Sequence, residues 1–415
     1  NLAMKSKKKF LFKILLPKKR TYFYPLLDEG LSNQDLYAGI KILKSGRITM
    51  GKQTVLFEKN FAKKLNVKYA LMVNSGSSAN LLAAFASCNP MRKNRFKKGD
   101  HALIQSLCWP TSLWPLVQTG LKINFVDVDP LTLNVKADEI IKKVTKKTKV
   151  ILIINVLGLS TDIEKIRSFC SKKKIILIED NCESLGAKFN NKYLGTFGDF
   201  GTFSFFYSHQ ITSGEGGMII CKNENDYEIL KALRSHGWSR DRKISKKYPN
   251  LDPRYIFVNS GFNLRPTDIQ ASIGLSQFKK LEKFRHIRSR NRNKIIINLF
   301  KNPKWNNQFK FIQAPKNISP SYMVLPILLN SKYRNRKAKF INFIESKGLE
   351  TRPIISGSFP KQPSAKLFKL NKNNFKFAGS EEVQKLGFVI GLHTKNINKK
   401  KIEFITKTLL SIDKI

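Results

Sequence analysis

The sequence is poor in acidic residues and in cysteine. The shortage of acidic residues makes the chain strongly basic, and the shortage of cysteine argues against several classes of protein. Among 415 residues, 29 Asp and Glu stand against 76 Lys and Arg, so the formal net charge is +47. The five cysteines form no CxC or CxxC pair, which argues against a disulfide scaffold, a zinc site and an iron–sulfur cluster. No apolar run approaches the roughly 20 residues that a membrane-spanning helix needs. We therefore expect a cytoplasmic protein with no membrane span and no metal site.

The excess of positive charge invites a nucleic-acid hypothesis, because phosphate neutralisation drives such binding. Lys and Arg are nevertheless spread over nearly every stretch, mixed with Asn and Ile, and form no single basic stripe. No helix-turn-helix, zinc-finger or RNA-recognition signature accompanies them. This distribution favours a solvated basic surface that attracts anionic substrates, and we expect no nucleic-acid partner. A non-catalytic nucleic-acid-binding or regulatory protein is a remote alternative.

The first 20 residues have a composition of their own. The segment Lys5–Arg20 reads KSKKKFLFKILLPKKR. Its short apolar core is interrupted by Lys13 and followed by no small-residue cleavage site, which disfavours a signal peptide. A basic arm that touches a membrane is one alternative. The interpretation we favour is a basic, disordered N-terminal extension over residues 1–20.

From Tyr24 onward, short apolar runs rich in β-branched residues alternate with helical patterns. The predicted strands are Tyr69–Val73, Ala102–Ile104, Ile123–Val126, Val150–Asn155, Ile175–Ile178, Gly201–Phe205 and Met218–Cys221. Strands that alternate with helices indicate crossover units in an α/β fold with a mainly parallel sheet. After about Gln277, a long basic helical pattern at Phe278–Phe300 precedes further strand and helix candidates. We therefore predict a large domain over residues 21–277 and a smaller α+β domain over residues 278–415.

A serine-rich turn follows the first predicted strand. In Asn74–Asn80, which reads NSGSSAN, the glycine lets the chain turn tightly between a strand and a helix. The free N–H groups and the dipole at a helix start favour a phosphate, and serine hydroxyls can add donors. The turn, with the hydroxyls of Ser77 and Ser78, is thus a candidate phosphate site, although such a turn is often only a helix N-cap.

Two further strands end in residues that could face a ligand, because parallel sheets bind ligands beyond the carboxyl ends of their strands. Asp180 follows an apolar strand and could reach a ligand over the sheet, or could cap the next helix. Trp109 follows the strand at Ala102–Ile104 and could stack on a flat cofactor, or could belong to the core. The residues alone leave both alternatives open.

His209 lies in a polar loop between the strand at Gly201–Phe205 and the glycine-rich segment Gly214–Gly217. Imidazole is the side chain best suited to move protons near neutral pH. A lone histidine is usually structural, but this one follows a strand at the expected ligand edge. His209 is therefore a candidate acid–base residue.

The four motifs are the serine-rich turn and the segments that contain Trp109, Asp180 and His209. In their order along the chain, they resemble those of the DegT/DnrJ/EryC1/StrS family of sugar-modifying enzymes, which depend on pyridoxal phosphate (PLP). The similar stretches are Phe125–Asp129, Glu179–Ser184, Phe205–His209, His236–Arg240, Gly261–Pro266 and Arg352–Phe359. The resemblance extends from Phe23 to Ile415. It implies the aspartate-aminotransferase-like fold (PLP fold type I), with a mainly parallel seven-stranded sheet and a smaller C-terminal α+β domain.

The sequence departs from the aminotransferases of that family at one residue. Those enzymes carry a lysine that holds the cofactor aldehyde as a Schiff base, and here His209 has the same spacing to Gly214–Gly217. No lysine occurs between Lys192 and Lys222, and imidazole cannot hold the aldehyde in that way. The chain is therefore similar to the sugar 3-dehydratases of the family, in which PLP or pyridoxamine phosphate (PMP) is bound non-covalently. The next residue is Gln210, where that subgroup often has a second histidine.

The resemblance also implies a role for each candidate residue. His209 would be the catalytic acid–base group. The implied cofactor-binding residues are Gly76, Ser77, Trp109, Asp180, Glu183, Ser204 and Asn263, and the implied substrate-binding residues are Arg265, His236 and Arg352. Gly76, Ser77 and Ser204 would bind the phosphate, Trp109 would stack on the ring, and Asp180 would pair with the ring nitrogen. Asn263 would reach the phosphate from a second subunit, which implies a homodimer, and Arg265 would receive the carboxylate of L-glutamate.

The implied reaction removes the C3 hydroxyl of a nucleotide-linked 4-keto-6-deoxy sugar, with GDP as the favoured nucleotide, and L-glutamate regenerates PMP. Such a step belongs to deoxysugar and lipopolysaccharide biosynthesis. The nearest alternative is a nucleotide-sugar aminotransferase of the same family. An aminotransferase would leave the amine in its product, whereas a dehydratase would release ammonia.

Overall fold

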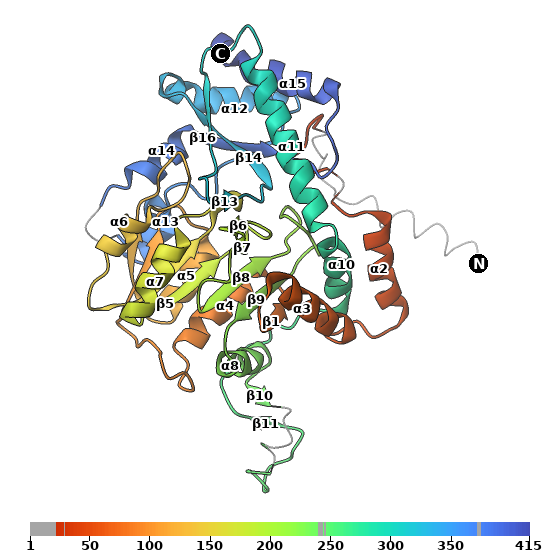
Figure 1. Cartoon of the computed structure of the whole chain (residues 1–415), viewed down its shortest axis with the longest axis vertical. Coiled ribbons are helices and arrows are strands. Elements are labelled where there is room, and N and C mark those ends of the chain that lie inside the picture. The colour runs from red at the N-terminus through yellow and green to blue at the C-terminus, as the bar shows by residue number, and fades with distance from the viewer. Residues whose placement is uncertain (1–21, 29, 240–243, 245, 372–374) are drawn as a thin grey trace, which may run out of the picture.

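The computed structural model describes residues 22–28, 30–239, 244, 246–371 and 375–415. The predicted basic extension over residues 1–20 lies outside them. Within the described residues, a large sheet with its helices forms the lower part of Figure 1, and a smaller sheet with its helices lies above it. In these ranges no helix combines the length and the apolar character needed to cross a membrane.

The central sheet has seven strands in the order β1-β9-β8-β5-β4-β2-β3. Its strands are β1 Tyr69–Val73, β2 His101–Gln105, β3 Lys122–Val126, β4 Thr148–Ile154, β5 Ile176–Asp180, β8 Phe200–Ser204 and β9 Gly217–Cys221. The strands from β3 to β8 pair in parallel, and β9 runs antiparallel to both β1 and β8. The predicted α/β fold with a mainly parallel seven-stranded sheet is thereby confirmed.

Helices cover both faces of this sheet. They are α2 Asn33–Lys44, α3 Lys52–Leu65, α4 Gly76–Ser87, α5 Pro110–Gln118, α6 Ala137–Lys142, α7 Ile163–Lys173, α8 Glu224–Arg234 and α10 Asp268–Phe278. Because successive side chains of a strand point to opposite faces, β1 contributes to two cores. Met72 packs in a cluster with Phe57 of α3 and Phe278 of α10, whereas Leu71 belongs to the larger cluster that contains Leu82 of α4.

A second sheet, which is entirely antiparallel, has the order β12-β14-β16-β15. Its strands are β12 Phe309–Phe311, β14 Val324–Leu329, β15 Thr351–Arg352 and β16 Gly387–Gly391, and its helices are α11 Leu281–Phe300, α12 Lys337–Ser346, α13 Pro363–Leu367, α14 Ala378–Leu386 and α15 Lys399–Leu409. This is the smaller α+β domain that the sequence predicts. The division of the chain at residues 277 and 278 stays a prediction, although α10 ends at Phe278 and α11 begins at Leu281.

Short elements complete the fold. The 3-10 turns are η1 Val156–Gly158, η2 Ser331–Arg336, η3 Phe359–Lys361 and η4 Leu410–Lys414, and the short strands are β6 Lys188–Phe189, β7 Lys192–Tyr193, β10 Trp238–Ser239, β11 Ile256–Phe257 and β13 Ile318–Ser319. β13 pairs with β6 and so joins the C-terminal part of the chain to the large domain. β10 and β11 pair with each other near the lower end of the molecule (Figure 1).

The N-terminal segment packs on the small domain rather than on the central sheet. The hydroxyl of Tyr24 donates to the carbonyl of Gly391 at 3.0 Å, and the N–H of Leu26 donates to the carboxylate of Glu350 at 2.7 Å. Tyr24 also stacks on His393 with ring centroids 4.2 Å apart. Residues from near both ends of the described chain therefore lie side by side.

Candidate active site

A cavity of about 610 Å³ opens where the strands of the central sheet end, which is within the range of small-ligand sites of about 300–1,000 Å³. Ile154, Asp180 and Ser204, the last residues of β4, β5 and β8, all line it. This is the edge at which parallel sheets bind ligands. The small domain closes the opposite side with Met323 and Arg352.

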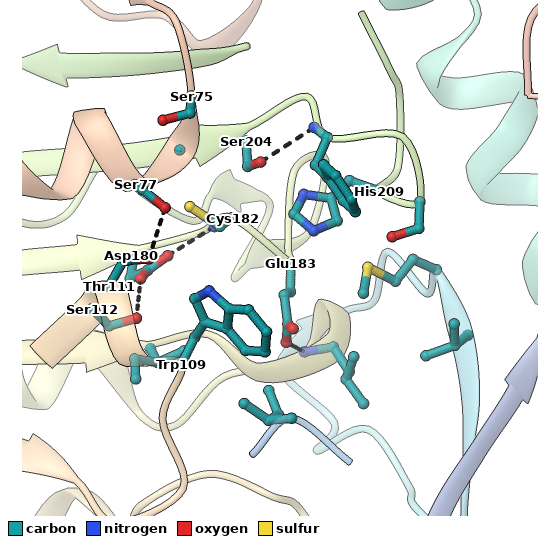
Figure 2. Close-up of a pocket in the computed structure, with 18 of the residues that line it drawn as sticks. Ser75, Ser77, Trp109, Thr111, Ser112, Asp180, Cys182, Glu183, Ser204 and His209 are labelled. Atoms are coloured by element: carbon teal, nitrogen blue, oxygen red, sulfur yellow. Dashed lines mark hydrogen bonds between the residues drawn. The ribbon is translucent and has the colours of Figure 1, made fainter. Parts of the chain in front are cut away.

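The serine-rich turn forms one wall of the cavity at the start of α4 (Figure 2). Ser75 is the N-cap of this helix, and its hydroxyl accepts from the N–H of Ser78 at 3.1 Å. Gly76 and Ser77, which follow Ser75, line the cavity. The Ser77 hydroxyl lies 2.8 Å from the hydroxyl of Thr111. The first N–H groups of a helix have no intrahelical acceptor, so this wall is suited to an anion.

Gly76 is required here because of a close approach between two chain segments. A Cβ atom at this position would lie 2.5 Å from the Cβ of Ser204 and 2.8 Å from the Sγ of Cys182. The absence of a side chain thus lets the start of α4 and the end of β8 converge. The turn is an N-cap, as one of the two sequence interpretations has it, and phosphate binding stays a prediction.

Asp180 is fixed by three hydrogen bonds at the end of β5, and it does not cap a helix. Its Oδ2 accepts from the amide of Asn80 and from the hydroxyl of Ser112, each at 2.7 Å. Its Oδ1 accepts from the N–H of Cys182 at 3.0 Å. With only 3% of its surface exposed, the carboxylate is held in one orientation at the base of the cavity (Figure 2).

Trp109 lies at the mouth of the cavity and is not part of the core. It is the N-cap residue of α5, and Pro110 follows it at the first helical position. Its side chain is 54% exposed and lines the cavity. The hydroxyl of Ser356 donates to the carbonyl of Cys108 at 2.6 Å and so holds the preceding residue from the small domain. A large ring held with an open face is suited to stacking on a flat ligand.

His209 projects into the same cavity from the loop between β8 and β9 (Figure 2). Its ring lies edge-on to Phe206 with centroids 5.8 Å apart. Its Nδ1 is buried and has no hydrogen-bond partner among the described residues. Burial lowers the pKa of His209 to about 4, although a backbone hydrogen bond with Ser204 and then the negative charge of Asp180 oppose this effect. The imidazole is therefore neutral at pH 7 and able to accept a proton.

Glu183 is an acidic group in the cavity with a strongly shifted pKa. Burial, and after it the negative charge of Asp180, raises the pKa of Glu183 to about 8. The N–H of Leu157 donates to its Oε2 at 3.3 Å. At pH 7 the cavity thus contains an acid that keeps its proton and a base that lacks one, a pairing typical of acid–base catalysis.

Eight of the predicted site residues line this one cavity. They are Gly76, Ser77, Trp109, Asp180, Glu183, Ser204, His209 and Arg352. Arg352 forms an ion pair with Glu350 at 2.8 Å, and its side chain is half exposed. The convergence of residues that lie far apart in the sequence agrees with a single site, and the individual roles stay predictions.

The other three predicted residues do not line the cavity of their own chain. His236 and Asn263 are exposed, and Arg265 donates to the side-chain oxygen of Asn263 at 3.0 Å. Ser235 and Asn263 form a β-bridge, so the three residues lie together on the surface. A separate surface group is what a contribution to a second subunit would require.

Sequence reasoning missed the residues that fix Asp180 and those that close the cavity. Asn80 lies one helical turn beyond Gly76, on the same face of α4, so helix periodicity could have found it. Ser112 lies in the first turn of α5, close to Trp109. Leu26 and Met323 also line the cavity, but their sequence surroundings carry no signal, because only packing between distant segments brings them there.

Comparison with known proteins agrees with this geometry. The model of the DegT/DnrJ/EryC1/StrS aminotransferase family matches residues 31–409. The chain is 36% identical over 377 residues to the GDP-4-keto-6-deoxy-D-mannose 3-dehydratase of Escherichia coli O55:H7, covering 89% of this chain and 95% of the relative. A protein of the same name from Yersinia pseudotuberculosis is 34% identical over 383 residues, covering 91% of this chain and 96% of the relative.

Solved structures lead to the same family. The structure of E. coli GDP-4-keto-6-deoxy-D-mannose-3-dehydratase with bound hydrated PLP has a TM-score of 0.82 and 33% identity, covering 94% of this chain and all of the other. A GDP-4-keto-6-deoxymannose-3-dehydratase with a trapped PLP-glutamate geminal diamine has a TM-score of 0.80 and 33% identity, covering 93% of this chain and all of the other. The chain therefore belongs to the DegT/DnrJ/EryC1/StrS aminotransferase family.

Proposed function

We propose that this chain is a PLP- and PMP-dependent dehydratase that removes the C3 hydroxyl of GDP-4-keto-6-deoxy-D-mannose. The observation that carries the proposal is the position of His209. An imidazole projects into the cavity where the aminotransferases of the family have a lysine, and no lysine lines the cavity within the described residues. Without an amine to hold the cofactor covalently, the site is suited to elimination rather than to nitrogen transfer.

The cavity fits a flat aromatic phosphate ester. The phosphate would lie at the start of α4, held by Gly76, Ser77 and Ser204, where a side chain on Gly76 would collide with Ser204. Trp109 would cover one face of the ring, and the fixed carboxylate of Asp180 would pair with the ring nitrogen. When bound, the pyridine ring supplies an electron sink for the bond-breaking steps.

The proton transfers fall to the chain's own side chains. His209 is neutral at pH 7, so its imidazole would be the general base that takes a proton from the amine-bearing carbon of bound PMP. The same imidazole, now protonated, can give that proton to the departing C3 hydroxyl, which leaves as water. Glu183 retains its own proton up to about pH 8, so its carboxyl would be available as a hydrogen-bond donor to the substrate. The amine nitrogen of PMP would then be lost as ammonia by hydrolysis, which would give a 3-deoxy-4-keto sugar and leave the cofactor as PLP.

L-glutamate would regenerate the amine form of the cofactor and yield 2-oxoglutarate. The trapped glutamate adduct in a similar dehydratase supports this co-substrate. Arg352 at the cavity mouth and Arg265 supply positive charge for the carboxylates of glutamate or the phosphates of the nucleotide. We place the reaction in the cytoplasm, in line with the five free cysteines and with a nucleotide-linked substrate.

We further propose a homodimer in which Asn263, Arg265 and His236 complete the partner's site. Two observations support this assembly: the three residues lie together on the surface, and they do not line the cavity of their own chain. A two-fold dimer would place each surface group against the other subunit's cavity.

The test incubates the purified protein with PLP, L-glutamate and GDP-4-keto-6-deoxy-D-mannose. A dehydratase releases one ammonia for each sugar and forms a product lighter by one oxygen than the substrate. An aminotransferase releases no ammonia and forms a 4-amino sugar. Formation of the amino sugar as the main product would contradict the proposal, and substrates with other nucleotides in place of GDP would measure the nucleotide preference.

A further inference from the structure

The residue next to His209 makes two contacts inside the protein. Gln210 is 1% exposed, and its amide nitrogen donates to the carbonyl of Ser321 at 3.0 Å and to the carbonyl of Glu183. Ser321 lies just before β14, and its hydroxyl donates to the carbonyl of Leu185 at 2.6 Å. One side chain thus joins the His209 loop, the Glu183 segment and the small domain.

A buried arginine holds the same loop from the other side. Arg288 of α11 is 3% exposed, and its guanidinium donates to the carbonyl of Gln210 at 2.8 Å, of His209 at 3.3 Å and of Leu392 at 3.1 Å. Its planar fork is rigid, so three bonds fix the relative positions of the three carbonyls. The backbone on which the imidazole is mounted is therefore tied to the small domain.

We propose that Gln210 and Arg288 are positioning residues that orient the imidazole of His209 and keep it at a fixed distance from Glu183. This inference rests on the proposed role of His209 as the acid–base group. A catalytic imidazole is commonly oriented by a hydrogen bond to its second nitrogen, but the Nδ1 of His209 has no partner among the described residues. The contacts that orient the ring are then the edge of Phe206, the backbone of Ser204 and its own loop backbone, which Gln210 and Arg288 hold.

The same contacts also govern the environment of the imidazole. Among the described residues, the charged groups that act on it are Asp180 from β5 and Arg288 from α11, and the positive charge of Arg288 adds to the effect of burial in lowering the pKa of His209. A loosened loop would admit water to the ring. Since burial is the largest cause of the low pKa, hydration would move it up toward the ordinary value of about 6.5.

The test replaces Gln210 by methionine, which has a similar length but no donor. The matched control is Gln308→Met, because Gln308 is also buried and its amide nitrogen also donates to two oxygens, but it lies in the small domain away from the cavity. Two further variants are made. Gln210→His keeps one hydrogen-bond donor, and Arg288→Lys keeps the positive charge but lacks the planar guanidinium that donates to three carbonyls.

The first measurement needs no activity. In protein with carbon-13-labelled histidine and no added cofactor, NMR titration follows the five imidazoles, and the His209 signal is identified by its loss in His209→Asn. The His209 pKa should rise by at least one unit in Gln210→Met and stay unchanged in Gln308→Met. An unchanged pKa in Gln210→Met, or an equal rise in Gln308→Met, would overturn the inference.

The second measurement separates kcat from KM. A displaced base should lower kcat by roughly 10- to 100-fold while KM changes little, in Gln210→Met and in Arg288→Lys, with partial recovery in Gln210→His. A rise in KM alone would overturn the positioning role. If the wild-type protein forms no 3-deoxy sugar, the proposed function fails, and the titration still decides whether the two residues hold the imidazole.

Discussion

The pH dependence of turnover tests the assignment of His209 as a base that is neutral in the cavity. Burial lowers the pKa of its imidazole to about 4. At pH 5 about 90% of such a group is neutral, against about 3% of an imidazole with the ordinary pKa of about 6.5. Because only the neutral form can accept a proton, kcat/KM should stay nearly level from pH 7 to pH 5 and fall only toward pH 4.

The alkaline side of the profile reports Glu183. Burial and the charge of Asp180 raise the pKa of its carboxyl to about 8, so kcat/KM should fall as the pH rises through that value and the proton is lost. Glu183→Gln keeps a hydrogen-bond donor but has no proton to lose. The alkaline fall should therefore disappear in this variant, while the acidic fall stays in place.

The assay measures initial rates of 3-deoxy sugar formation between about pH 3.5 and 9 at limiting substrate. His209→Asn should reduce kcat by about 10²- to 10⁴-fold without changing thermal stability, because the Nδ1 of His209 makes no hydrogen bond within the described residues. The exposed His286 of α11 provides the control, and His286→Asn should keep full activity. A wild-type acid limb centred near pH 6.5 would refute the argument for a buried, neutral base.

Three further predictions follow from the same cavity. Borohydride treatment of the PLP-loaded protein should leave its denatured mass unchanged, whereas His209→Lys should retain the reduced cofactor; a stable adduct in the wild type would rule out non-covalent binding. Gly76→Ala should weaken PLP binding at least tenfold, because the new methyl group would collide with Ser204. The control Gly30→Ala should bind PLP normally, because its methyl group would lie 3.4 Å from the ring of Tyr207, an ordinary contact. Fluorescence titration measures both affinities. A randomly reassociated 1:1 mixture of the inactive variants His209→Asn and Asn263→Ala should recover about a quarter of wild-type activity if Asn263 acts across a two-fold interface, because half of the dimers are mixed and each has one intact site. No recovery would show that Asn263 does not act in this way.

The sequence predicted the central sheet well because the signal there is local. Each strand of the sheet is a short apolar run, so hydrophobicity alone indicates where it begins and ends within two residues. Asp180, Trp109 and His209 were found for a related reason. Asp180 ends β5, Trp109 and His209 lie in the loops that follow β2 and β8, and the carboxyl ends of parallel strands lie together at one edge of the sheet.

The sequence could not predict the contacts that arise only from packing between distant segments. Gln210 looks like an ordinary polar loop residue, and its bond to the carbonyl of Ser321 spans 111 residues. Arg288 looks like one basic residue among many in α11, since nothing in its neighbourhood marks it as buried. The pKa values of His209 and Glu183 belong to the same class, because burial causes both shifts and burial is a property of the assembled fold.

The hydrogen bond between Tyr24 and Gly391 joins residues that are 367 positions apart, and Leu26, two residues after Tyr24, forms part of the cavity wall. During synthesis, the first strands can pair long before the last ones leave the ribosome. The cavity is nevertheless incomplete until β16 has been made, so a growing or truncated chain would have the cofactor cradle without the wall that shields it from water. Activity should therefore appear only at the end of folding, in a single step, and prematurely terminated chains should have no catalytic activity.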